Sequence, residues 1–128
     1  FLEPLSSPEN VSINMQMLIK RIDMSDKNII EKSAFLAQEI WLNQPFIDGN
    51  KRTARLLINF MTMKEGFPLF TYENKGAFFN DMLVNQYTMR KAGLIEEFII
   101  ESLENRMNEL LDLGNNKSQN FTGFRFIL

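Results

Sequence analysis

Apolar residues recur along this chain at intervals of three and four, the spacing that places side chains on one face of an α-helix. The clearest stripe consists of Ile30, Ala34, Ala37 and Trp41. We expect helices over about Ser7–Asp23, Ser25–Asn43, Asn50–Glu65, Glu73–Arg90 and Leu94–Leu113. No series of alternating strands is visible, so the pattern predicts an all-α helical bundle.

Turn and cap residues separate these segments. Ser7-Pro8 and Ser25-Asp26 are typical of helix starts, and Gly66 with Pro68 is typical of a stop. The expected inward-facing residues of the first, third and fourth helices are Val11, Met15, Leu18 and Ile22, then Leu56, Leu57, Phe60, Met61 and Met63, then Phe78, Met82, Leu83 and Tyr87. Residues 1–113 therefore form one predicted core, and residues 114–128 form a C-terminal tail that pairs as a strand or packs loosely.

Composition narrows the possible functions. Fourteen basic and 16 acidic residues give a formal charge of -2, which does not favour nucleic-acid binding. The apolar runs are too short to span a membrane, and we expect a cytoplasmic location. The chain contains neither Cys nor His, so it supplies no thiol nucleophile and no imidazole base.

The most informative stretch is QPFIDGNKRTAR, from Gln44 to Arg55, which leads into the third predicted helix. Gly49 and Asn50 allow left-handed backbone geometry, so that successive N–H groups can face one anion where a helix begins. Lys51, Arg52 and Arg55 add positive charge, and Asp48 is a carboxylate suited to a divalent cation. The stretch indicates a site for phosphate and a metal ion.

Each of these residues also has a purely structural interpretation. Asp48 could cap the next helix, and Arg52 and Arg55 could form a solvated face. Lys51 and Arg55 could be two surface cations four residues apart. The cluster favours an anion site more than its members do singly, because like charges at one helix start repel each other.

The stretch resembles the signature of the Fic (filamentation induced by cyclic AMP) family, His-Pro-Phe-x-(Asp/Glu)-Gly-Asn-(Gly/Lys)-Arg-x-x-Arg, at every position except the first. The similarity extends over roughly residues 4–112 and includes the following LLINFMTMKEGFP and the later LIEEFIIESL. It implies a Fic-type bundle in which the signature loop lies between two central helices. It also implies transfer of AMP, or another phosphate-containing group, from a nucleotide such as ATP to a Ser, Thr or Tyr hydroxyl of a target protein.

The resemblance also implies residue roles. Asp48 would hold Mg²⁺, and Gly49, Asn50 and Lys51 would form the anion hole. Arg52 and Arg55 would hold phosphates, with Arg55 on the terminal one. Phe46 would anchor the loop in the core.

Two positions affect the expected activity. Gln44 replaces the family's catalytic His, and the loss of a positioned base typically costs about 10²–10⁴ in rate, so we expect impaired catalysis. The Lys at position 51 of the motif resembles the motif of the Doc branch of the family, which transfers a terminal phosphate. A Doc-like phosphotransferase and a non-catalytic nucleotide- or partner-binding module therefore remain alternatives.

Regulatory and target-binding features of the family are only partly represented. No (Ser/Thr)-x-x-x-Glu-(Gly/Asn) inhibitory helix is found, so any inhibitor would lie upstream or on an antitoxin-like partner. Residues 1–8 match only the end of the flap that holds the target peptide in this family.

Overall fold

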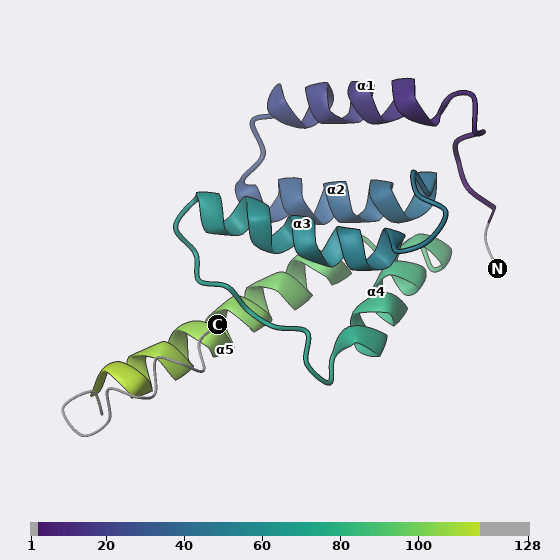
Figure 1. Ribbon diagram of the computed structural model, residues 1–128. Helices are drawn as coiled ribbons and strands as arrows, with labels where there is room; N and C mark the ends of the chain where they lie inside the picture. The colour runs from purple at the N-terminus through teal and green to yellow at the C-terminus, as the bar shows by residue number, and fades with distance from the viewer. Residues whose placement is uncertain (1–2, 116–128) are drawn as a thin grey trace.

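The computed structural model describes residues 3–115 as a bundle of helices without β-strands in that range (Figure 1). The all-α prediction is confirmed. The helices are α1 Val11–Asp23, α2 Ile29–Asn43, α3 Asn50–Lys64, α4 Gly76–Thr88 and α5 Leu94–Asn115. No helix of the described residues is both long and apolar enough to cross a membrane.

Helix α2 lies at the centre of the bundle. It packs most extensively against α3 and also contacts α1 and α5, while α4 packs on α5. In Figure 1, α1 forms an outer layer on one side of α2, and α4 and α5 lie on the other side. The expected stripe of α2 is confirmed, because Ala34, Ala37 and Trp41 are buried and Ile30 packs against the core.

Two helices begin later than predicted. In the N-terminal segment, Ser7 accepts hydrogen bonds from the N–H groups of Asn10 and Val11 through its carbonyl oxygen, and the regular helix starts only at Val11. Helix α2 starts after Asn28, whose Oδ1 accepts the Glu31 N–H at 2.9 Å. Ser25 instead accepts the Lys27 N–H at 3.2 Å, which closes a local turn and not a helix.

The limits of α4 and α5 also differ from prediction. The chain turns between Tyr72 and Lys75, whose N–H donates to the Tyr72 carbonyl oxygen at 2.8 Å, so α4 starts at Gly76. At its other end, Arg90 has a positive φ of 50° and interrupts the helix. Helix α5 continues through Gly114 to Asn115, because a single glycine does not prevent helical geometry. The predicted strand or loose packing of the tail falls on residues 116–128, outside the described part.

The inward-facing residues were only partly predicted. Ala54, Ile58, Asn59 and Thr62 form the buried face of α3, and Phe79 and Leu83 that of α4. The predicted Leu56, Phe60, Met63, Phe78 and Tyr87 are exposed. The predicted Leu57, Met61 and Met82 do pack against the core, and the predicted Leu83 is buried. The predicted stripes on these two helices thus overlap the true faces only in part, because both faces carry apolar residues.

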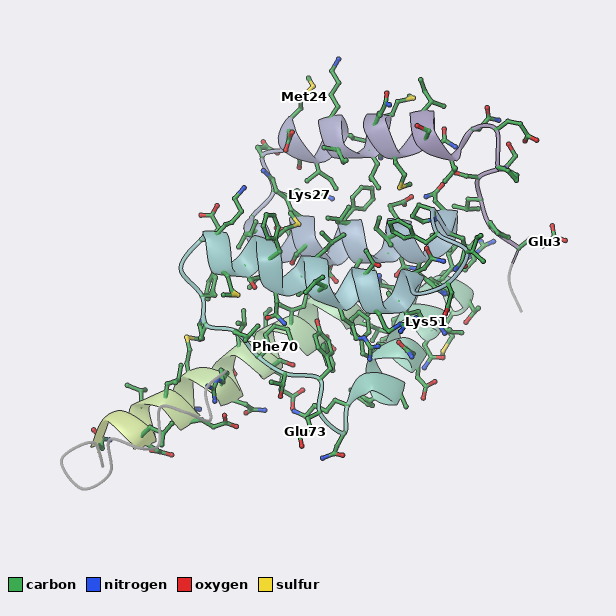
Figure 2. The ribbon with its side chains drawn as sticks, in the orientation of Figure 1. Glu3, Met24, Lys27, Lys51, Phe70 and Glu73 are labelled. Carbon is green, nitrogen blue, oxygen red and sulfur yellow. The ribbon has the colours of Figure 1, made fainter. Side chains whose placement is uncertain are left out.

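A pair of hydrogen bonds fixes the connection between α3 and α4. Asn59 donates from Nδ2 to the Phe70 carbonyl oxygen at 2.8 Å and accepts the Phe70 N–H at 3.2 Å. Figure 2 shows Phe70 and Glu73 on this connection, below α3. The Tyr72 ring packs against Phe79 and Phe98 at centroid distances of 5.3 and 5.8 Å. These contacts hold the start of α4 against the rest of the bundle.

Candidate functional site

The loop between α2 and α3 is held in shape by polar side chains. Gln44 ends α2 in the left-handed region, with φ 50° and ψ 57°. Its Nε2 donates to the Trp41 carbonyl oxygen at 2.7 Å, and its Oε1 accepts from Asn50 Nδ2 at 3.0 Å. Asn50 also accepts the Phe46 N–H at 3.0 Å and donates to the Phe46 carbonyl oxygen at 2.9 Å. The buried Asn50 amide therefore ties together the two ends of the loop.

The prediction that Phe46 anchors this loop in the core is wrong. Its side chain is 52% exposed, and the loop is instead fixed through the Phe46 backbone by Asn50. The neighbouring Ile47 is fully exposed. The apolar part of the signature thus lies at the surface beside the site.

The start of α3 combines a left-handed glycine with an exposed ion pair. Gly49 is the N-cap residue, with φ 85°, and its N–H donates to Asp48 Oδ1 at 2.7 Å. Asp48 Oδ2 lies 3.1 Å from an Arg52 guanidinium nitrogen, and these side chains are 89% and 69% exposed. Exposed pairs contribute little stability, so a bound anion or cation can displace either partner at small cost.

The loop opens onto a cleft of about 440 Å³. It is lined by Gln44, Ile47, Asp48, Gly49, Asn50, Lys51, Arg52, Arg55 and Asn80. Figure 2 shows Lys51 at the N-terminal end of α3, on the side where α4 lies. Thus every residue assigned to the site from the sequence faces one cleft.

The cations that line this cleft outnumber the acids among the described residues. Three cations, Lys51, Arg52 and Arg55, face it together with one carboxylate, Asp48. Among the described residues no ion pair is formed by Lys51 or Arg55, and the first turn of α3 carries no acidic residue. A helix N-terminus itself carries partial positive charge from its free N–H groups, so these cations are unfavourable there unless an anion is bound.

Arg55 approaches the cleft from the second turn of α3 and rests on α4. Its guanidinium carbon lies 5.6 Å from the centroid of the Tyr72 ring. The Tyr72 hydroxyl donates to the Arg55 carbonyl oxygen at 3.3 Å. Burial raises the pKa of Tyr72 well above its ordinary value, and the Arg55 charge opposes this only in part, so the phenol stays protonated.

Sequence reasoning missed the contribution of α4 to the site. Asn80 lines the cleft, and its Oδ1 is buried without a hydrogen-bond partner among the described residues. Gly76 lies so close to Arg55 that a Cβ built there would be 2.5 Å from the guanidinium NH1. The sequence of α4 carries no signal for these roles. The helix lies 20 or more residues beyond the signature, and only the fold places it beside the cleft.

A second hollow adjoins the cleft. It has a volume of about 380 Å³ and is lined by Glu3, Pro4, Trp41, Leu42, Gln44, Lys51 and Val84. The N-terminal segment reaches it because the Leu5 N–H donates to the Leu42 carbonyl oxygen at 2.8 Å and Ser6 donates to Asn43. Gln44 and Lys51 line both hollows, so Gln44 stands at their junction.

The site can hold a metal ion only with help from a ligand. No group of three or more His, Cys, Asp or Glu side chains suited to a metal occurs within residues 3–115. Asp48 is exposed, pairs with Arg52 and accepts the Gly49 N–H, and it fits an ion that takes one protein carboxylate and otherwise phosphates and water, as Mg²⁺ often does.

The chemistry available is anion binding and charge neutralisation. Backbone N–H groups, three cations and one carboxylate can hold a phosphate chain, which is the main requirement of phosphoryl-type transfer. The side chain at the junction of the two hollows is the Gln44 amide, which has no useful basicity near neutral pH. An all-helical domain with this loop and a cationic cleft thus has the groups that phosphate binding requires.

The comparisons with known proteins agree. Residues 3–62 match the model of the Fic/DOC family, in agreement with the resemblance of the sequence to this family. The chain is 42% identical over 65 residues to protein adenylyltransferase fic-1 of Caenorhabditis elegans, covering 48% of this chain and 13% of that protein. It is 51% identical over 39 residues to protein adenylyltransferase fic-1 of Caenorhabditis briggsae, covering 30% and 8%. The chain thus matches only a small part of the length of these relatives.

Proposed function

We propose that the cleft binds ATP with Mg²⁺ and that the domain is of the nucleotide-transferring Fic type. The observation that carries this proposal is the convergence of Lys51, Arg52 and Arg55 on the N-terminus of α3, where Asp48 is the one acid of the described residues that lines the cleft. The phosphates of a nucleotide supply the missing negative charge. Arg52 would leave Asp48 to bind phosphate.

Asp48 would then be free to hold Mg²⁺. The ion would neutralise charge on the phosphate chain and fix its orientation. The backbone N–H groups of Asn50, Lys51 and Arg52 would form the anion hole. The Asn50 side chain is already bonded within the loop, so its share in this hole is limited to the backbone.

The proposed reaction is transfer of AMP to a protein hydroxyl. Its support is the family match and the names of the two relatives, both adenylyltransferases. The hydroxyl oxygen of the target would attack the α-phosphorus, and pyrophosphate would leave. The hydroxyl proton needs an acceptor near Gln44, and an amide is a poor one, so we infer that the reaction is slow in this chain.

A non-catalytic nucleotide-binding module is the second candidate. It is favoured by the state of Gln44, whose amide nitrogen and oxygen are both already hydrogen-bonded, to Trp41 and Asn50. In that case the site binds a nucleotide and transfers nothing.

Two measurements separate these functions. Isothermal titration with ATP and Mg²⁺ should show binding that is weakened about 100-fold or more by Arg52→Ala together with Arg55→Ala, since each arginine provides a charge-assisted hydrogen bond. No detectable binding at millimolar ATP would refute the site. Incubation with α- and γ-labelled ATP then distinguishes AMP transfer, phosphate transfer and binding alone.

A further inference from the structure

We propose that Gly76 is a positioning residue for Arg55. The Tyr72 ring and the Gly76 backbone, which has no side chain, together form a contact surface, called the seat below, that holds the guanidinium in the cleft. This inference rests on the proposed function, because it assigns the seat to the binding of nucleotide phosphate. It concerns how the arginine is held and not which phosphate it binds.

The glycine at position 76 has no backbone explanation. Gly49, Gly66 and Gly93 have φ values of 85°, 92° and 90°, which favour glycine, whereas Gly76 is not among the residues with positive φ. Gly76 is the first residue of α4, where alanine is the better helix former. What the missing side chain provides is space.

That space is occupied by Arg55. A Cβ on residue 76 would lie 2.5 Å from NH1 and 3.8 Å from the guanidinium carbon of Arg55, and the first distance is too short for a real contact. The atoms in conflict are the end of a flexible side chain. A methyl group here would therefore shift the guanidinium and leave the backbone in place.

The other side of the seat is the Tyr72 ring. The centroid of this ring lies 5.6 Å from the guanidinium carbon of Arg55, and the ring itself packs on Phe79 and Phe98. An arginine has many rotamers, so a seat that selects one of them reduces the entropy lost when phosphate binds. Asn80, one turn after Gly76, lines the same cleft.

The test is a double-mutant cycle on the intact chain, with ATP–Mg²⁺ titrated calorimetrically. Gly76→Ala should weaken binding about tenfold, at the lower end of the effect expected for a lost charged hydrogen bond, while thermal stability is unchanged or higher. In an Arg55→Ala background, Gly76→Ala should have no further effect. An equal loss in both backgrounds would overturn the proposal.

Gly114→Ala is the matched control. Gly114 is also helical, and a Cβ there would meet nothing within 4 Å, so ATP binding should be unchanged. A loss of affinity in Gly76→Ala that accompanies a fall in thermal stability would indicate a structural role and overturn the proposal.

A ligand-free measurement keeps the two proposals distinguishable. By NMR, nuclear Overhauser contacts between Arg55 and the Tyr72 ring should be present in the unaltered chain and in Gly114→Ala, and should be lost in Gly76→Ala. Unchanged contacts in Gly76→Ala would overturn the seat even if ATP binds. If the unaltered chain binds no ATP, the proposed function fails, and the NMR result alone decides whether the seat holds Arg55.

Discussion

The side chain of Asn50 donates a 3.0 Å hydrogen bond to the amide oxygen of Gln44, so the end of α2 is joined directly to the start of α3. The same Asn50 amide accepts the Phe46 N–H and donates to the Phe46 carbonyl oxygen. Gln44 is therefore part of the hydrogen-bonded framework of the loop. The Gln44 amide links α2 to α3 at the position where the proposed chemistry would take place.

Asn50→Ala should loosen this framework. Three hydrogen bonds are lost, and the backbone N–H and C=O groups of Phe46 lose their Asn50 partner, so we expect the free energy of unfolding to fall by about 2–3 kcal/mol. Urea denaturation measures the change. Asn105→Ala, at an exposed position of α5, is the control and should change stability little. Equal effects of the two substitutions would contradict the role given to Asn50.

Asp48→Asn should separate metal binding from phosphate binding. If Asp48 holds Mg²⁺, ATP affinity in the variant should no longer depend on Mg²⁺. Without Mg²⁺, the variant should bind ATP as tightly as the unaltered chain or a few-fold, about 2–5-fold, more tightly, because Arg52 loses its carboxylate partner at 3.1 Å. Titrations with Mg²⁺ and with EDTA test both parts.

Asp112→Asn provides the control for this change in charge. Asp112 is an exposed residue of α5, so its substitution should leave the Mg²⁺ dependence as it is in the unaltered chain. A persistent Mg²⁺ dependence in Asp48→Asn would place the metal on other groups.

Tyr72 should make the fold sensitive to alkali. Its pKa is raised by burial, only partly offset by Arg55, so the folded state keeps the phenolic proton above pH 10, where the unfolded chain releases it. Below that pH both states are protonated and the group has no effect. Above it, the free energy of unfolding should fall by up to about 1.4 kcal/mol per pH unit.

Tyr72→Phe removes this titration and should lose less stability between about pH 9 and pH 11 than the unaltered chain. Urea denaturation at the two pH values gives the difference, in which the titration of the lysines cancels. Tyr87→Phe, at a tyrosine that is 41% exposed, is the control and should not reduce the alkaline loss. Identical pH dependence in Tyr72→Phe and the unaltered chain would refute the role of burial.

The sequence was sufficient for the helical class and for the loop, because both are encoded locally. The three-to-four spacing identified α2, and Gly49 with its neighbouring cations identified the start of α3. The predicted boundaries differ from the observed ones because competing caps were available: Asn28, rather than Ser25 or Asp26, accepts the Glu31 N–H. The side chain with the better hydrogen bond determined the start.

The rest of the site could not be predicted, because it depends on tertiary packing. Phe46 is aromatic, which favours a core position, yet the Asn50 amide holds the loop and leaves the ring outside. Tyr72, Gly76 and Asn80 join the site only because Asn59 and the aromatic cluster fix the connection to α4. No local pattern in these residues indicates an arginine 17 or more positions earlier.

Gln44→His tests whether proton transfer is the missing function. His is among the residues that tolerate positive φ, so the left-handed backbone at this position should accept it, although the hydrogen bonds to Trp41 and Asn50 are altered. If the phosphate-binding groups are correctly placed, labelling of a target or of the chain itself from ATP should rise by about 10²–10⁴. The gain should fall as the pH drops below the imidazole pKa of about 6.5, since only neutral imidazole accepts the proton.

Gln44→Asn is the matched control, because Asn also tolerates this backbone but offers no base, and it should show no gain. The activity should also disappear when Asp48 or Arg52 is replaced by Ala in the Gln44→His chain. If Gln44→His binds ATP–Mg²⁺ yet transfers no label to itself or to a protein target, the missing base is not the reason for inactivity. The domain is then better described as a nucleotide-binding module.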